Sequence, residues 1–472
     1  MNNKNKLKYN KGQILIQVIV FGSIAVYLLV ALVGLALINI KAGRQVFNRE
    51  QALQIAEAGI DYYRWHLAHV PTDFQDGTGG PGPYVHDFRD KDGNIIGEFE
   101  LDITAPAVGS TIVTITSTGR VDDAPSVYRT ITSQLGKSSF AKYSWALNSE
   151  FVRFGSTAEV FGPVHSNVGI RFDGLAHNLV TSAVANFDDP DHSGGNEFGV
   201  HTHGNSLDSG SDPLPPVPIP NRPLIFEAGR QLSVPAVDFN GITGDLANMK
   251  TDAQIGGVYL ANSGALGYRV NLRINDTFDV YRINSVVAAC GGATTWSIAG
   301  ETFLQNYPNP ANGVIFVEDH VWVNGQIATA QITIASGRFP DNASTRTNII
   351  ANNDVLYTNY DGQDVLGLIA QGNFYVGLVS EDDLRVDAAI IAQNGAVRRP
   401  SYSSSSCGST RSRTIFTSYG MLGSNLRPAF VYSSSNGYQN RVYNYDANLL
   451  YGPPPNFPLT SDQYVVLTWE EQ

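Results

Sequence analysis

The feature that most constrains this chain is an apolar run at residues 18–38, in which no side chain is charged. Ser23 is its one clearly polar residue. As an α-helix, these twenty-one residues rise about 30 Å, the thickness of the hydrocarbon core of a bilayer. The run is also longer than the apolar region of a secretory signal peptide and has no clean small-residue cleavage site. It predicts a membrane-spanning helix.

The charges beside this run predict its orientation. Four lysines and no acidic residue precede it, namely Lys4, Lys6, Lys8 and Lys11. Because basic flanks tend to stay in the cytoplasm, we expect the N-terminus there and the rest of the chain outside the cytoplasm. Basic residues that follow the run, Lys41, Arg44 and Arg49, weaken this asymmetry without reversing it.

The helix is expected to continue beyond the membrane. Residues 39–70 contain no proline, and Pro71 stops the helix. Apolar residues recur there at steps of three and four and therefore share one helix face: Leu53, Ala56, Ile60, Tyr63 and Leu67. Residues 13–70 are thus predicted to form a single transmembrane and amphipathic helix of about 85 Å.

Two short segments carry a resemblance to a known family. The basic leader of residues 1–12 ends in Lys11 and Gly12, and residues 51–60 read QALQIAEAGI. A basic leader ending in glycine, an apolar helix and an amphipathic continuation resemble type IV pilins and pseudopilins. The run ALQIAEAGI resembles, in particular, the minor pilins of the PilX N-terminal family.

This resemblance implies processing and assembly. A prepilin peptidase is expected to cut after Gly12 and to leave Gln13 as the first residue of the mature chain. The helix is expected to pack with other pilin subunits, with candidate assembly residues Gln17, Ala56, Glu57, Ala58, Gly59 and Ile60. Glu57 lies between two alanines and is either a pairing residue or a plain solvated helix residue.

Two residues depart from the usual pilin pattern. The family's first mature residue is Phe or Met, where this chain has Gln13. Its fifth mature residue is a glutamate that pairs with a neighbouring subunit's amino terminus, where this chain has Gln17. A neutral amide avoids the cost of a carboxylate in lipid and also loses that attraction. We therefore expect a priming, tip or accessory subunit rather than the repeated subunit of a filament.

Composition narrows the kind of head that follows the helix. Charged residues make up 16% of the 472 residues, and 46 residues are glycine. Low charge with many glycines is typical of a β-rich protein with many turns. The net charge of −12 argues against a nucleic-acid partner, because phosphate binding needs clustered Lys and Arg. Cys290 and Cys407 either pair as a disulfide or remain free thiols.

Residues 71–136 are predicted to form a small antiparallel β domain. Residues 72–94 are rich in Gly, Pro and Asp and are expected to be a loop. Three strand candidates follow at residues 95–104, 110–117 and 126–135, and the last two alternate apolar and polar residues and are rich in Val, Ile and Thr. By resemblance to pilin heads, this sheet is expected to cover the apolar face of the helix.

Residues 137–472 are expected to form a large β-rich extracytoplasmic domain. Short apolar strands alternate with Asn, Asp or Gly corners at residues 151–182 and 313–396. This pattern favours a β-solenoid, with a β-sandwich as the alternative. Residues 186–223 are predicted as a linker or long surface loop, and residues 398–472 as a strap that closes the stack. The predicted fold class is α+β.

Two polar clusters invite a chemical interpretation. Zinc-type ligands occur at Asp188, Asp189, Asp191, His192, His201 and His203, but a solvated loop explains them without a metal. Paired carboxylates of the kind used in glycan cleavage occur at Glu381, Asp382, Asp383 and Asp387, where an exposed turn is the simpler explanation. The sequence has no G-x-S-x-G and no H-E-x-x-H motif. We expect no enzyme activity, no cofactor and no metal.

Together these features predict a minor-pilin-like, membrane-tethered subunit of a type IV pilus or related filament. Its extracytoplasmic head is expected to serve filament assembly or adhesion. The expected partners are the cytoplasmic membrane, other pilin subunits and a prepilin peptidase, with no nucleic acid. The alternative is a single-pass surface protein whose β-solenoid head binds or cleaves glycans.

Overall fold

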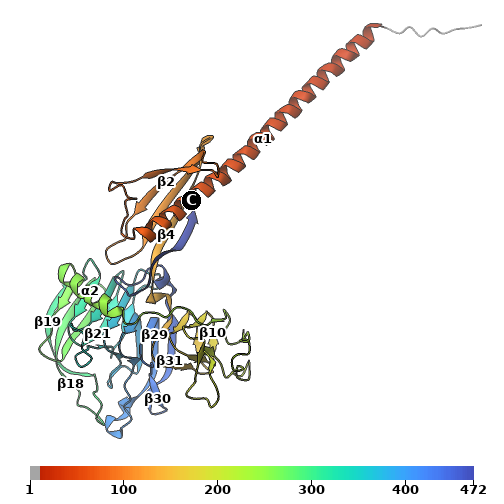
Figure 1. Ribbon diagram of the computed structural model, residues 1–472. Helices are drawn as coiled ribbons and strands as arrows, with labels where there is room; N and C mark the ends of the chain where they lie inside the picture. The colour runs from red at the N-terminus through yellow and green to blue at the C-terminus, as the bar shows by residue number, and fades with distance from the viewer. Residues whose placement is uncertain (1–10) are drawn as a thin grey trace, which may run out of the picture. The chain divides into compact units, whose positions relative to one another are not determined.

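The computed structural model describes residues 11–472 of the chain. Lys4, Lys6 and Lys8, on which the predicted orientation depends, lie outside the described residues. The first element is the helix α1 (Lys11–His69) of 59 residues, at the red end of the colour bar in Figure 1. It includes both the apolar run and the amphipathic continuation, so the predicted single long helix is confirmed.

The helix α1 ends two residues before Pro71. Proline lacks a backbone N–H and restricts the residue before it, so a helix does not continue through this point. Large apolar side chains between Ile14 and Phe47 are exposed, whereas Ile55, Ile60, Tyr63 and Leu67 are buried and Trp65 is 58% exposed. One helix therefore has two halves with different surroundings.

A five-stranded sheet follows α1, in the order β1-β2-β3-β4-β32. Its strands are β1 (Tyr84–Arg89), β2 (Ile95–Thr104), β3 (Val113–Val121), β4 (Ala124–Ser139) and β32 (Leu459–Glu471). β2 pairs antiparallel with both β1 and β3. The predicted antiparallel sheet is confirmed, and β2 has the bounds expected from the sequence.

Two strands of this sheet were not expected there. β1 lies in the segment predicted as a loop, because its short run of Tyr, Val and Phe is surrounded by Gly, Pro and Asp. β32 joins the sheet beside β4 instead of closing the end of the head. The Ser133 hydroxyl donates to the Thr468 carbonyl at 2.7 Å across a sequence separation of 335 residues. Local patterns do not report a pairing between segments so far apart.

The chain divides into two compact units. The first comprises residues 1–104, 114–134 and 468–472, and the second comprises residues 105–113 and 135–467. The first unit thus contains α1, β1 and β2. The strands β3, β4 and β32 of the same sheet are divided between the two units.

The second unit is built from short strands. Those before residue 232 are β5 (Trp145–Leu147), β6 (Val152–Phe154), β7 (Glu159–Val160), β8 (Val164–Ser166), β9 (Ile170–Phe172), β10 (Leu175–Ala176), β11 (Val180–Ser182), β12 (Asn186–Phe187), β13 (Glu197–Phe198), β14 (Val200–His201) and β15 (Arg230–Gln231). Next come the helix α2 (Ile242–Ile255), β16 (Val258–Leu260), β17 (Gly267–Arg273), β18 (Thr277–Val286), β19 (Ile298–Pro308), β20 (Val314–Val317), β21 (Val321–Ile327), β22 (Gln331–Ser336) and β23 (Ile349–Ile350). The last are β24 (Val355–Tyr357), β25 (Val365–Ala370), β26 (Phe374–Tyr375), β27 (Asp383–Ala392), β28 (Val397–Arg398), β29 (Ser412–Ser424), β30 (Val431–Ser433) and β31 (Asn436–Tyr445). Single 3-10 turns occur at η1 (Phe140–Lys142), η2 (Ser405–Cys407), η3 (Ser409–Arg411) and η4 (Ala447–Leu450).

The main ladder of the second unit is parallel. It passes from β20 through β22, β25, β27 and β29 to β5, β8 and β11. Along β20, Val314 and Phe316 belong to the core under α2, while Ile315 and Val317 belong to the core on the opposite face. Strands buried on both faces read as continuous apolar runs, which is typical of parallel sheets.

No regular solenoid is detected among residues 11–472, contrary to the sequence prediction. Residues stacked at one level of the ladder, such as Thr333, Gly367, Ala389 and Met421, follow one another at unequal spacings. β18 also pairs antiparallel with β17 and β19. The short strands stack in parallel as their apolar character suggests, but the insertions between them differ in length and leave no constant repeat.

The two cysteines form a disulfide in the second unit. Cys290 and Cys407 are separated by 117 residues and have a Cα–Cα distance of 5.1 Å. Of the two alternatives that the sequence leaves open, the structure therefore shows the paired one. Closing a loop of this length contributes about 4 to 5 kcal/mol in the chain-entropy model.

Candidate functional site

The N-terminal half of α1 presents a long apolar surface that the described chain does not cover. Every Ile, Leu, Val and Phe from Ile14 to Phe47 is exposed, with Ile19 at 61% and Leu35 at 58%. Among residues 11–472, this is the one helix long and apolar enough to cross a membrane. An exposed apolar surface of this extent marks contact with a membrane or another protein.

One polar side chain of this half is satisfied within the helix. The Ser23 hydroxyl donates to the Val20 carbonyl at 2.8 Å. An α-helix pairs its own backbone N–H and C=O groups, which is the condition for entering a lipid phase. Residues 18–38 carry no charged side chain, and their second hydroxyl belongs to Tyr27, which is 76% exposed.

The residues predicted for processing lie at the start of α1. Gly12, Gln13 and Gln17 are all helical and exposed. A Cβ atom at Gly12 would meet no other atom within 4 Å. The space around Gly12 is open within the part of the chain that the structure describes, and the roles of Gly12, Gln13 and Gln17 in cleavage and assembly stay predictions.

The packed half of α1 contains the run that resembles minor pilins. Ala56, Gly59 and Ile60 are buried, whereas Glu57 is exposed and Ala58 is partly exposed. The small residues of the run therefore have an intramolecular role, because they lie against the chain's own sheet. Of the residues predicted for assembly in this half, Glu57 and Ala58 are the ones that face outward.

Small residues on both sides bring α1 close to the sheet. A Cβ atom at Gly119 in β3 would lie 2.2 Å from the Ala52 carbonyl oxygen and 2.5 Å from the Ala56 amide nitrogen. A Cβ atom at Gly59 would lie 2.3 Å from the Ser117 hydroxyl oxygen. Real Cβ atoms do not approach other atoms so closely, so glycine is required at both positions. Figure 1 shows this end of α1 beside β2.

Sequence reasoning missed the sheet residues that make this packing possible. Gly97 lies in β2 and Gly119 in β3, and a Cβ atom at Gly97 would lie 2.5 Å from Cδ1 of Ile55. A glycine inside a strand often marks a close backbone approach, so a signal was present. It did not say which segment approaches, since that depends on the tertiary fold.

The loop after α1 fixes the packed end of the helix. The Asp73 carboxylate accepts hydrogen bonds from the amides of Gln75 at 2.8 Å and Gly77 at 2.6 Å, and it pairs with His66 at 2.9 Å. The Tyr63 hydroxyl donates to the Asp73 carbonyl at 2.9 Å. The Gln75 hydrogen bond, with help from His66 and against partial burial, holds the pKa of Asp73 below its usual value.

The acidic residues near 381–387 do not gather into a pair of free carboxylates. Asp382 and Asp383 are exposed, whereas Asp387 is fully buried. Asp387 accepts from the Tyr360 hydroxyl at 2.7 Å, the Tyr357 amide at 3.1 Å and Arg385 Nε at 2.8 Å. These partners account for its burial as a structural carboxylate.

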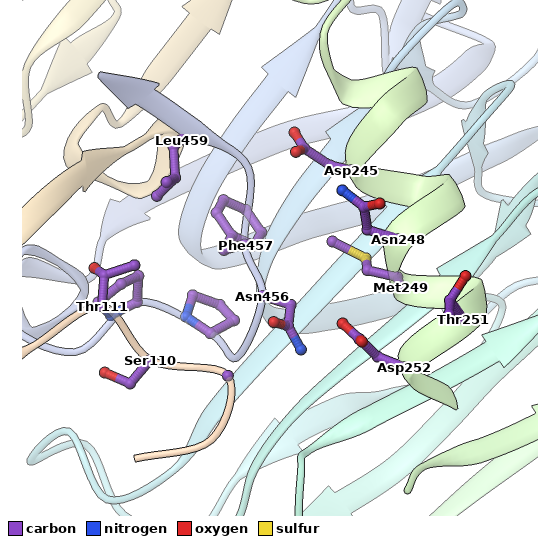
Figure 2. A pocket seen from close by; sticks show the side chains of 13 residues that line it. Ser110, Thr111, Asp245, Asn248, Met249, Thr251, Asp252, Asn456, Phe457 and Leu459 are labelled. Carbon is purple, nitrogen blue, oxygen red and sulfur yellow. The ribbon is translucent and has the colours of Figure 1, made fainter. Parts of the chain in front are cut away.

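A pocket of about 500 Å³ lies within the second unit, beside α2. Figure 2 shows Asp245, Asn248 and Asp252 on α2, with Asn456 and Phe457 across the pocket. Burial, reinforced by Asp238 and Asp462, raises the pKa of Asp245 to about 6. The lining residues include no histidine, cysteine or basic side chain, so we assign no reaction to this pocket.

The acidic and histidine-rich segment at residues 186–203 is more ordered than a solvated loop. It contributes β12, β13 and β14, and both Asp189 and His201 have 0% exposure. The solvated-loop interpretation is therefore wrong for these two residues, although Asp188 and Asp191 are exposed. Glycine- and serine-rich sequence without periodicity concealed this burial.

No protein-family model matches this chain, and no curated protein matches it in sequence. Among solved structures, it is similar to the competence-associated pilin ComZ from Thermus thermophilus, with 14% sequence identity over 90% of this chain and 98% of that chain. The TM-score is 0.29, which establishes neither a shared fold nor a shared function.

Proposed function

We propose that this chain is a minor-pilin-like subunit of a type IV pilus or related filament. In this proposal, residues 18–38 of α1 anchor it in the cytoplasmic membrane, and the part after α1 forms a head outside the cytoplasm. The head serves filament assembly or adhesion and catalyses no reaction. Its expected partners are the membrane, other pilin subunits through α1, and a prepilin peptidase.

The observation that carries this proposal is the uninterrupted course of α1. Its apolar half lacks any covering from the described chain, and its other half forms part of the core of the first unit. For a protein that is only tethered to a membrane, a flexible linker between the anchor and the head is enough. In this chain a single rigid helix belongs to both the anchor and the head. When its apolar half packs against neighbouring helices, the helix also fixes the position of the head, as a filament subunit requires.

The same apolar surface suits both a bilayer and a filament core. Lipid tails are about as apolar as leucine, so exchanging lipid for neighbouring helices costs little hydrophobic free energy. Small residues then allow helices to approach closely. Gly22, Gly34 and Gly43 lie in the exposed half, and a Cβ atom at each would meet nothing within 4 Å. These positions are open to another helix.

The residue Gln17 supports an accessory role rather than a repeated one. By resemblance to pilins, a glutamate at this position would attract the amino terminus of a neighbouring subunit. Gln17 is exposed and carries no charge, so it offers no ion pair. A subunit without this attraction fits a priming or tip position, where few copies are needed.

Processing by a prepilin peptidase tests the proposal. The full chain would be expressed with and without the peptidase, extracted from membranes, and analysed by intact mass and N-terminal sequencing. We expect loss of residues 1–12 and a new terminus at Gln13 only when the peptidase is present. Gly12→Leu should block the cut, while Gly22→Leu, in the same exposed helix half, should leave it unchanged.

The alternative function predicts a different outcome. A permanently anchored surface protein keeps residues 1–12 in both expressions and behaves alike in the wild type and in Gly12→Leu. That result would contradict the filament proposal and leave the head as a tethered surface domain.

A further inference from the structure

Five potential metal ligands converge in the second unit, far in sequence from α1. They are Asp189, His192, Glu197, His201 and His203. They form two groups of three that share His203, and within each group the ligand atoms lie within 4.8 Å of one another. Three histidines with two carboxylates form a donor set typical of zinc and similar divalent transition metals.

The hydrogen bond of His201 fixes which of its nitrogens can act as a ligand. Nδ1 lies 2.9 Å from the Phe198 carbonyl oxygen, which can only accept, so Nδ1 carries the proton. In a neutral ring, Nε2 then has a free lone pair, and it lies 3.3 Å from Oδ2 of Asp189. Two lone pairs facing each other in a fully buried site need a cation between them, either a proton or a metal ion.

His203 supplies a second, independent indication. Its Nε2 is buried and has no hydrogen-bond partner, and it lies 3.9 Å from the same Oδ2 atom of Asp189. An imidazole nitrogen without a hydrogen-bond partner is available to bind a metal ion.

The distances between these atoms match a coordination shell. Ligands about 2.0 to 2.1 Å from a tetrahedral zinc ion lie about 3.4 Å apart. The two observed separations from Asp189 Oδ2 are 3.3 Å to His201 and 3.9 Å to His203. Small side-chain movements would bring all three atoms to one ion.

The surrounding contacts hold the ligands in place. The Asp191 amide donates to Oδ1 of Asp189 at 2.8 Å, which leaves Oδ2 toward the histidines. Glu197 accepts from the Asp189 amide at 3.1 Å and pairs with Nδ1 of His192 at 2.5 Å. Supporting hydrogen bonds of this kind orient ligands and tune metal affinity.

The local charges are compatible with a bound cation. Arg171 approaches Asp189 at 3.8 Å, but its Nε donates to Asp173 at the shorter distance of 2.7 Å. Asp189 and Glu197 therefore provide negative charge, and Arg171 compensates only part of it. A divalent ion would complete this compensation.

We propose that Asp189, His201 and His203 bind a divalent transition-metal ion, with zinc as the best match, and that water fills the fourth position. The ion connects the loop after β12 to the strand β14 and its following residues. It acts as a cross-link within a segment rich in Gly and Ser, where apolar packing is sparse. This site is independent of α1 and of filament assembly.

Metal content of the full chain in detergent tests the proposal. The purified protein would be treated with EDTA, loaded with Zn²⁺, desalted, and analysed for zinc by mass spectrometry. We expect about one zinc per chain in the wild type, and a loss of about tenfold or more in His203→Ala. The control is His177→Ala, because His177 pairs with Glu159 at 2.7 Å and with Glu227 at 2.6 Å outside the cluster.

A metal-free account of the same site predicts a different result. If a protonated His201 simply pairs with Asp189, the wild type retains no zinc after desalting, and the proposal is overturned. Equal zinc retention by His203→Ala and the wild type would also overturn it, as would loss of zinc in His177→Ala alone.

A second readout separates metal binding from folding. Circular dichroism would first establish that His203→Ala is folded, and His203→Gln, which keeps a polar side chain of similar length, replaces it if it is not. Co²⁺ loaded in place of Zn²⁺ should give the visible absorption of a tetrahedral site in the wild type and in His177→Ala. The same spectrum in either His203 variant would contradict the proposed ligand set.

Discussion

The two halves of α1 belong to one helix and have opposite surroundings. In the packed half, Ala52, Ile55 and Tyr63 have 0% exposure. In the N-terminal half, Leu28 and Val30 are 60% and 65% exposed. Both halves contain apolar side chains, but the packed half also carries charged ones such as Glu57, Asp61 and Arg64.

The difference lies in side-chain size and arrangement. The packed half places alanine and glycine on one face, where β2 and β3 approach with glycines of their own. Residues 18–38 of the N-terminal half are apolar around the whole circumference of the helix, which is typical of a helix surrounded by apolar material on every side. One pattern is satisfied by this chain's own sheet, and the other requires a bilayer or the helices of other subunits.

Of the changes that test this difference between the two halves, removal of the N-terminal half should have the largest effect on the protein. A chain lacking residues 1–47 loses apolar side chains that are each worth about 1.5 to 3 kcal/mol on burial. We expect the full chain to need detergent and the shortened chain to stay in solution with the same near-ultraviolet circular dichroism. A shortened chain that still sediments without detergent would show that the packed half also has uncovered apolar surface.

Truncating one isoleucine in each half should give unequal losses of stability. Ile55 is fully buried and Ile38 is 64% exposed. Ile55→Ala should lower the free energy of unfolding by about 2 to 5 kcal/mol, because it leaves a cavity under the sheet. Ile38→Ala should leave the unfolding of the head in detergent unchanged. Chemical denaturation measures the free energy of unfolding of both variants. Equal losses would contradict the difference in burial between the two halves.

Adding one methyl group to a glycine in each half should give effects of opposite sign. Gly59→Ala should cost about 1 to 3 kcal/mol, because its Cβ would collide with Ser117. Gly43→Ala should be neutral or stabilise the helix by up to about 1 kcal/mol, since nothing lies within 4 Å of the new atom. Thermal unfolding in detergent measures both, and a stabilised Gly59→Ala would show that the close approach is absent.

The smallest loss of stability should come from a substitution in the loop after α1. Asp73→Asn removes the charge from a group hydrogen-bonded to Gln75 and Gly77, which should cost about 1 kcal/mol at pH 7. Because the pKa of Asp73 is lowered in the folded chain, its contribution is present above the unfolded pKa of about 3.9 and disappears as pH falls through the folded value. The melting temperatures of variant and wild type should therefore converge in acid.

Asp61, which lies on α1, provides a control for this pH dependence. The Asp61 side chain is 70% exposed, and Arg64, at 3.2 Å, is its one ion-pair partner among residues 11–472. Asp61→Asn should change the melting temperature little at any pH, because exposed ion pairs contribute little. A difference between Asp73→Asn and the wild type that stays constant down to strong acid would contradict the assigned role of the carboxylate.

Sequence periodicity predicted the parts of the fold that depend on local chemistry. The spacing of Ala56, Ile60, Tyr63 and Leu67 gave the buried face of α1, and the alternation of apolar and polar residues indicated strands where β3 and β4 lie. These signals work because helix and strand periods determine which side chains share a face. The candidate site in α1 was found in the same way, from an uninterrupted apolar run.

Features that depend on distant pairing were not accessible in this way. β32 joins β4 across more than three hundred residues, as the 335-residue separation of Ser133 and Thr468 shows. Unequal insertions between stacked strands removed the expected solenoid repeat. Burial of Asp189 and His201 depends on neighbouring strands, so a segment that reads as a solvated loop turned out to contain a convergent set of ligands.

The central claim is that lipid covers the N-terminal half of α1 while the packed half lies outside the bilayer. Single cysteines at Leu28→Cys and Ala58→Cys, tested in intact membranes with an impermeant maleimide, measure this directly, because Cys290 and Cys407 are paired and do not react. We predict labelling of Ala58→Cys from outside the cytoplasm, and labelling of Leu28→Cys only after detergent is added. Rapid labelling of Leu28→Cys in intact membranes would contradict the account.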